Sequence, residues 1–243
     1  MTFRMNGYGH LRTYDLKLTA LSPVFIGSGA SFSKKEYMYD KDLHIVRFID
    51  YDRFSDYLVK NGLFDRYERF ILYSGDYLDA FFSECRTSAR EIEEMTLYTA
   101  DAGEAITPGK ALNEIHRFIR NGSGAPYIPG SSVKGAIRTA VLTRMLLEKP
   151  VRYADFKTLE KELLNTMKLN TKNRTDMVNS VMRGVSVSDS EPLRKSRMVL
   201  AKKTDLSVTG NFKSPNLVRE CLTPGTAARL RLTVDSSVPG APD

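Results

Sequence analysis

The stretch YIPGSSVKGAIRTAVL, Tyr127–Leu142, passes within a few residues from a rigid loop into a helical pattern. Val133, Ile137 and Val141 recur every fourth position, which is the spacing of one face of a helix. The pattern continues to about residue 148, and Pro150 is expected to end it because proline cannot continue a helix. The sequence therefore predicts a long amphipathic helix that begins directly after a Pro-Gly pair.

The start of this helix has the chemistry of an anion site. The first turn of a helix presents unpaired N–H groups and a partial positive charge. Gly130 would let a backbone or a phosphate approach closely, and Ser131 or Ser132 is expected to cap the helix and offers a hydroxyl. Lys134 and Arg138 are four positions apart and share one face. An RNA phosphate is a suitable occupant, although an ordinary amphipathic helix with two solvated cations has the same pattern.

The order of residues excludes a nucleotide-triphosphate loop. That motif requires a glycine before the lysine and a serine or threonine after it. Here the order is Lys134, Gly135 and Ala136, so the lysine precedes the glycine. The basic helix start therefore does not predict an ATPase.

The positive charge is concentrated in the second half of the chain. The 243 residues carry a formal net charge of +7. Residues 1–130 hold 16 Lys and Arg against 18 Asp and Glu, whereas residues 131–243 hold 20 against 11. A polyanion is the natural partner for such a half. We expect no membrane partner, because there is no apolar run of about 18 residues and no long basic amphipathic helix with bulky aromatic residues.

The cysteines and the N-terminus indicate a reducing compartment. Cys85 and Cys221 are far apart in the sequence, and neither belongs to a CxxC or Cys/His cluster. The N-terminal stretch lacks the apolar region of a signal peptide. We therefore expect a cytoplasmic protein with no metal site, no disulfide framework and no cofactor.

Strand and helix patterns are mixed along the chain without regular βα repetition. Alternating patterns predict strands or hairpins at residues 14–20, 36–49, 184–190, 197–202 and 228–234. Helical patterns are found at residues 50–94, with Asp50 or Asp52 as the cap, and at 113–120 and 153–167. A turn is expected at residues 220–225. This mixture predicts the α+β class with an antiparallel sheet.

A second candidate site is the glycine-rich stretch Gly27-Ser28-Gly29, which follows a short apolar run. Two glycines around a serine would let the backbone approach a phosphate or a sugar. The other interpretation is a turn that reverses the chain.

The stretch from Ile128 to Arg138 resembles the signature I-P-G-S-S-h-K-G-h-h-R of the RAMP superfamily of CRISPR proteins, where h is hydrophobic. Every fixed position of the signature has its match here. Within the superfamily, four stretches resemble the fifth Csm subunit of type III-A effector complexes, in family order. They are LTALSPVFIGSG, NEIHRFIRNGSGAPYIPGSSVKGAIRT, VSVSDSEPL and RECLTPGT.

The resemblance implies a ferredoxin-like, RRM-type βαββαβ core with an antiparallel sheet and helical insertions. We expect one domain over residues 1–243, with an ordered core at about 13–234 and a helical insertion at about 50–94. Family members continue beyond the last strand expected here. The C-terminal helical portion of the family is therefore expected to be missing from this chain.

The resemblance also implies a role without catalysis. The family member is a cap that holds the 3′ side of the guide (CRISPR) RNA and contributes to its 3′-end maturation and to antiviral defence. The implied partners are the guide RNA and the repeated backbone RAMP subunit, with a small helical Csm subunit as a further candidate and target RNA as an indirect one. The expected RNA-binding residues are Gly27, Ser28, Gly29, Gly130, Ser131, Ser132, Lys134, Gly135 and Arg138.

Two alternatives remain open at this point. One is a guide-RNA-processing endonuclease of the same superfamily, with His116 as its acid or base. Asp189 has a loop context like that of a cleaving aspartate, but Ser-Asp-Ser is a common turn and we assign no catalytic residue. The other alternative is a scaffold that contacts only protein neighbours, whose affinity for RNA would not respond to salt.

Overall fold

The computed structural model describes residues 2–5, 9–106, 114–148, 156–173, 175–213, 215 and 217–238. The chain forms two compact units, and each combines a sheet with helices. The first unit comprises Met1–Thr19, Tyr127–Pro192 and Ala227–Asp243, and the second comprises Ala20–Pro126 and Leu193–Thr226. The predicted α+β class is confirmed, whereas the predicted single domain stays a prediction.

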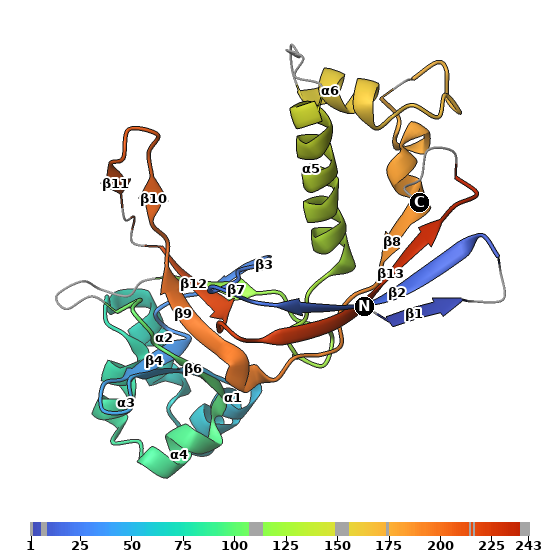
Figure 1. Cartoon of the computed structure of the whole chain (residues 1–243). Helices are drawn as coiled ribbons and strands as arrows, with labels where there is room; N and C mark the ends of the chain where they lie inside the picture. Colours follow the sequence, from blue (N-terminus) through green and yellow to red (C-terminus); the bar gives the residue numbers. More distant parts are fainter. Residues whose placement is uncertain are drawn as a thin grey trace. The chain divides into compact units, whose positions relative to one another are not determined.

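The sheet of the first unit has four strands in the order β1-β2-β13-β8 (Figure 1). Their bounds are Thr2–Met5 for β1, Leu11–Thr19 for β2, Ala227–Asp235 for β13 and Val185–Val187 for β8. Both β2 and β8 pair antiparallel with β13, so they run parallel to each other with β13 between them. This is the split βαβ arrangement of ferredoxin-like folds.

Two helices cover one face of this sheet. They are α5, Gly130–Glu148, and α6, Phe156–Leu163, followed by the 3₁₀ turns η1, Met177–Asn179, and η2, Val181–Gly184. The buried centre of this packing consists of Leu142, Leu159, Leu164, Met182 and Val185. The predicted end of α5 at residue 148 is confirmed. The helix predicted over 153–167 is shorter, and residues 153–155 lie outside the described residues.

The second unit contains a seven-stranded sheet in the order β3-β7-β12-β9-β6-β5-β4. The strands are β3, Gly27–Phe32; β4, Tyr37–Asp40; β5, Ile45–Ile49; β6, Thr96–Asp101; β7, Ile115–Phe118; β9, Met198–Lys202; and β12, Val218–Leu222. The pairs β7–β12 and β6–β9 are parallel and the others are antiparallel. The sheet is therefore mixed, because the long connections between these strands permit parallel pairing.

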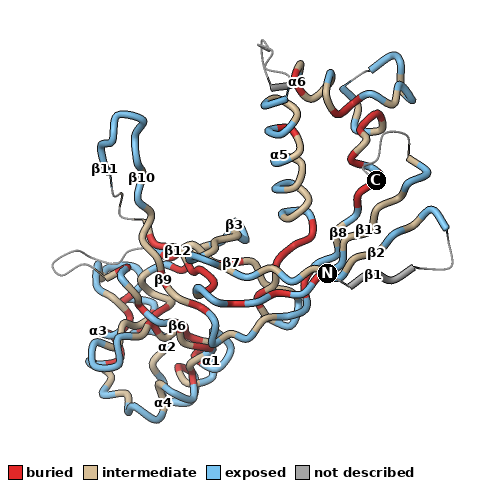
Figure 2. Tube along the Cα trace, in the orientation of Figure 1, coloured by how far each residue is buried: buried red, intermediate tan, exposed pale blue. Residues whose placement is uncertain are grey.

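Four helices of the second unit lie between β5 and β6, grouped beside β4 and β6 in Figure 1. They are α1, Tyr51–Lys60; α2, Phe64–Tyr73; α3, Leu78–Cys85; and α4, Ala89–Glu94. Asp50 caps α1 by accepting hydrogen bonds from the N–H groups of Asp52 and Arg53. The helices enclose an aromatic core that includes Phe54, Tyr67, Phe70, Phe81 and Phe82. In Figure 2, where buried residues are red, red segments lie in the group of helices and strands around α2 and β6.

The remaining elements of the second unit are the 3₁₀ turn η3, Lys195–Arg197, and a short hairpin. The hairpin strands are β10, Asp205–Leu206, and β11, Phe212–Lys213, and the hairpin extends away from the seven-stranded sheet in Figure 1. No helix of the described residues is both long and apolar enough to span a bilayer.

Three local predictions were wrong. Residues 115–118 form strand β7 rather than a helix, and Asn113 lies outside the described residues. Ile115 and Phe118 suggested helical spacing, but both are buried because β7 lies inside the sheet and packs on both faces. The expected turn at 220–225 begins only after β12 ends at Leu222. The stretch Gly27-Ser28-Gly29, which one interpretation made a turn that reverses the chain, is instead the irregular start of β3.

Candidate nucleic-acid interface

The helix α5 begins at Gly130, and its first N–H group already has an acceptor. The Gly130 N–H donates to Asp189 Oδ1 at 2.8 Å. Ser131 and Ser132 therefore lie inside the first turn, and the prediction that one of them caps the helix was wrong. The carboxylate of Asp189 provides the negative charge that the start of a helix favours.

Gly130 is required by the packing of the first unit. A Cβ atom at this position would lie 2.1 Å from the carbonyl oxygen of Val187 and 2.7 Å from that of Ser188. Gly130 is buried, so its missing side chain lets α5 start directly against the end of β8. The close approach that we expected for a phosphate is here made by the protein's own backbone.

The segment after β8 is fixed on both sides by hydrogen bonds. The N–H of Ile128 donates to Ser190 Oγ, and the N–H of Ser190 donates to the Ile128 carbonyl, both at 2.9 Å. Ser188 exchanges hydrogen bonds with Arg231 of β13: its Oγ accepts from the Arg231 N–H, and its own N–H donates to the Arg231 carbonyl. The Ser-Asp-Ser sequence thus positions the helix start, which gives Asp189 a structural role.

The next turn of α5 presents an accessible cation among small residues. Ser131, Ser132 and Gly135 are exposed, and Lys134 is partly exposed. Among the described residues, the side chain of Lys134 forms neither a hydrogen bond nor an ion pair. A Cβ atom at Gly135 would meet nothing within 4 Å, so the fold does not require glycine there. This face is open to a partner that approaches the helix backbone closely.

Arg138 has an internal partner. Its guanidinium forms an ion pair with Glu160 of α6, and the two side chains are only 29% and 16% exposed. The pair ties α5 to α6. Arg138 is therefore less available to a phosphate than its spacing from Lys134 suggested.

The glycine-rich stretch belongs to the second unit, whereas the signature helix belongs to the first. Gly27, Ser28 and Gly29 are exposed at the start of β3, and Gly29 has a φ of +83°, which glycine adopts without strain. The Ser28 hydroxyl donates to the Arg117 carbonyl at 3.3 Å. The irregular backbone at the start of β3 is a local structural reason for glycine at these positions. The proposed contact of these residues with RNA stays a prediction.

His116 lies on β7, opposite Ser31 on one side and Arg219 on the other. Among the described residues its imidazole has no hydrogen-bond, ion-pair or ring partner. The described residues also contain no group of three or more His, Cys, Asp or Glu side chains placed to hold a metal ion.

Three cations on the outer face of the first unit's sheet were not among the predicted site residues. Lys17 on β2 and Arg229 and Arg231 on β13 are all exposed. The signal was present in ARLRLTV, where arginine alternates with buried leucine. We interpreted that alternation only as a strand and did not consider which residues face solvent.

Comparison with known proteins identifies the class. The family model described as the RAMP superfamily matches residues 17–236, which is most of the chain. The chain therefore belongs to the RAMP superfamily.

Relatives within that superfamily are Csm5 proteins. The CRISPR system Cms protein Csm5 of Mycobacterium tuberculosis is 31% identical over 264 residues, covering 96% of this chain and 68% of the relative. The protein of the same name from Streptococcus thermophilus is 29% identical over 238 residues, covering 94% of this chain and 66% of the relative. The chain thus spans about two thirds of the length of these relatives.

Solved structures share the fold. The crystal structure of T.onnurineus Csm5 has a TM-score of 0.69 and 23% identity, and covers 91% of this chain and 68% of that one. A chain in the cryo-EM structure of a Csm-crRNA-target RNA ternary complex, from a type III-A CRISPR-Cas system, has a TM-score of 0.63 and 20% identity. The match covers 91% of this chain and 64% of the chain in that complex. These matches establish the RAMP fold that we expected from the signature.

Proposed function

We propose that this protein is a non-catalytic, guide-RNA-binding cap subunit of a type III-A Csm complex. In this role it holds the 3′ side of the guide RNA and contributes to its 3′-end maturation and to antiviral defence. The Csm5 relatives and the RNA-containing Csm complex support complex membership and RNA as a partner. The proposed protein neighbours are the repeated backbone RAMP subunit and a small helical Csm subunit, and the proposed location is the cytoplasm.

The observation that carries the proposal is the open turn of α5. Lys134 has no partner among the described residues and lies beside exposed hydroxyls and a glycine whose surroundings are empty. Hydroxyls, a lysine and bare backbone are typical contacts for phosphate oxygens. Because Arg138 forms an ion pair with Glu160, Lys134 is the main phosphate-binding residue proposed for this helix.

We expect Lys134→Gln to weaken guide-RNA binding and to reduce the slope of log affinity against log salt by about 1, as for one lost phosphate contact. The measurement is a salt titration of RNA affinity, together with sequencing of guide 3′ ends in the assembled complex. Arg144→Gln is the matched control, because Arg144 is a cation on the same helix that pairs with Glu148 and is 76% exposed.

Arg138 should be tested in a separate variant. Arg138→Gln is expected to lower the melting temperature, because it leaves the partly buried Glu160 without its partner. A double variant of Lys134 and Arg138 would mix these two effects. An unchanged affinity, salt slope and guide 3′ end in Lys134→Gln would contradict the proposed role of α5.

A further inference from the structure

Two cations lie side by side on neighbouring strands of the first unit's sheet, on the same face. The register of β2 and β13 places Lys17 directly opposite Arg229, and both side chains are exposed. Like charges directly opposite each other destabilise a sheet. The next cross-strand pair on this face is Asp15 opposite Arg231, which combines opposite charges. The stability of the sheet therefore does not explain why Lys17 and Arg229 lie opposite each other.

No carboxylate of the described residues forms a direct ion pair with either cation. Neither Lys17 nor Arg229 forms an ion pair or a side-chain hydrogen bond with any of them. Glu191 is held close by, because its N–H donates to the Arg229 carbonyl at 3.0 Å, but its carboxylate does not pair with either cation. The two cations are thus available to an external anion at the surface of the sheet.

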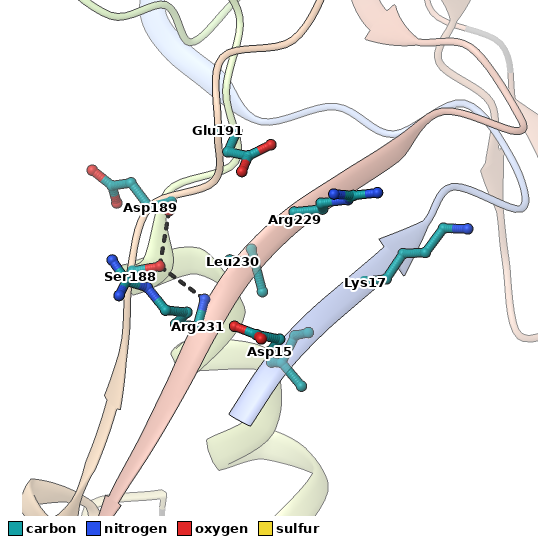
Figure 3. A pocket seen from close by; sticks show the side chains of 9 residues that line it. Asp15, Lys17, Ser188, Asp189, Glu191, Arg229, Leu230 and Arg231 are labelled. Carbon is teal, nitrogen blue, oxygen red and sulfur yellow. Dashed lines mark hydrogen bonds between the residues drawn. The ribbon is translucent and has the colours of Figure 1, made fainter. Parts of the chain in front are cut away.

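The pair borders a hollow of about 810 Å³ in the first unit, shown in Figure 3. This volume is within the range of about 300–1,000 Å³ that is usual for ligand sites. The lining residues are Asp15, Leu16, Lys17, Ser188, Asp189, Glu191, Arg229, Leu230 and Arg231. In Figure 3, Lys17 and Arg229 project from neighbouring strands, and Glu191 lies on the adjoining segment beside Arg229. The hollow therefore combines cations with carboxylate acceptors.

This combination fits a nucleotide unit of RNA. A phosphate can bridge a lysine and an arginine and would remove their repulsion. A carboxylate accepts hydrogen bonds, and the ribose 2′-hydroxyl is a donor that distinguishes RNA from DNA. An acidic protein segment would also place anions beside the cations, whereas RNA adds to its phosphate a ribose hydroxyl that can donate to a carboxylate of the hollow.

We propose that this hollow binds one nucleotide unit of single-stranded RNA, with its phosphate between Lys17 and Arg229 and its ribose hydroxyl on Glu191. The inference rests on the proposed function, because it assigns a second contact region for the same RNA.

The test uses the 243-residue chain, a single-stranded RNA oligonucleotide and a DNA oligonucleotide of the same sequence. We expect the double variant Lys17→Gln/Arg229→Gln to bind RNA at least about tenfold more weakly, with a salt slope reduced by about 1, as for the loss of one phosphate contact. Its melting temperature should be equal to that of the wild type or higher, because the variant removes repulsion. Glu191→Gln should reduce the preference for RNA over DNA.

Lys157→Gln is the control, because Lys157 is an exposed lysine on α6 and does not line the hollow. Unchanged RNA affinity in the double variant would overturn this inference, and if Lys134→Gln still weakened binding, the proposed function would stand. A wild-type chain that binds no RNA would overturn the proposed function itself. Loss of binding to an acidic peptide, with RNA binding intact, would assign the cation pair to a protein partner and would also overturn the inference.

Discussion

Replacing Glu220 by glutamine is expected to lower the free energy of unfolding of the second unit by about 3–5 kcal/mol, the usual cost of breaking a buried ion pair. Glu220 is fully buried in β12, and its ion-pair partner Arg120 has a side chain that is only 9% exposed. The substitution removes the negative charge and leaves the guanidinium buried without compensation.

The surroundings of this pair explain why the cost should be large. Glu220 Oε2 also accepts the N–H of Phe118 at 3.0 Å, and Arg120 donates to the Gly124 carbonyl at 3.1 Å. The guanidinium lies 4.1 Å from the ring centre of Tyr98. Burial raises the pKa of the Tyr98 phenol, and the Glu220 carboxylate raises this pKa further. The pair therefore lies in a poorly hydrated region where an isolated charge is expensive.

Denaturant unfolding of the chain would measure this effect. The double variant Arg120→Met/Glu220→Leu is the informative control, because replacing both charges by apolar side chains of similar volume is often neutral or stabilising. It should recover most of the stability that the single variant loses. A single variant that loses less than about 1 kcal/mol would show that water reaches the pair, and our account of it would then be wrong.

The fold could be predicted where local patterns and tertiary contacts agree. The apolar spacing of α5 and the alternation of β13 follow directly from the residues that face the core of the first unit. Residues 115–118 and 218–222 were missed because their state depends on pairing between segments about a hundred positions apart. A glutamate is rarely buried without a partner, and it is the pairing with Arg120 that allows Glu220 to be buried.

The candidate site shows the same limit. The signature identified the helix start and the partly exposed Lys134, because both follow from local sequence. The partners that occupy its other groups come from distant segments: Asp189 accepts from Gly130, and Glu160 pairs with Arg138. Spacing within one helix cannot reveal such partners. The opposed cations Lys17 and Arg229 depend on a strand register that no local pattern contains.

Gly130→Ala is expected to destabilise the first unit by at least about 3 kcal/mol, at or above the upper end of what overpacking usually costs. The added methyl group would lie 2.1 Å from the carbonyl oxygen of Val187, a backbone atom that cannot rotate away. The helix start would have to move, which would also break the hydrogen bond from the Gly130 N–H to Asp189. Thermal and denaturant unfolding would measure the loss.

Gly135→Ala is the matched substitution five positions later on the same helix. The fold has room for its methyl group, and alanine is favoured over glycine inside a helix by about 0.5–1 kcal/mol. We therefore expect Gly135→Ala to stabilise the chain and yet to weaken RNA binding, since the methyl group covers backbone that the RNA approaches. Opposite changes in stability from two identical substitutions would separate the glycine that the fold needs from the glycine that the ligand needs. If Gly135→Ala left RNA affinity unchanged, the partner would not approach α5 closely at this position, and Lys134 would bind it through its side chain alone.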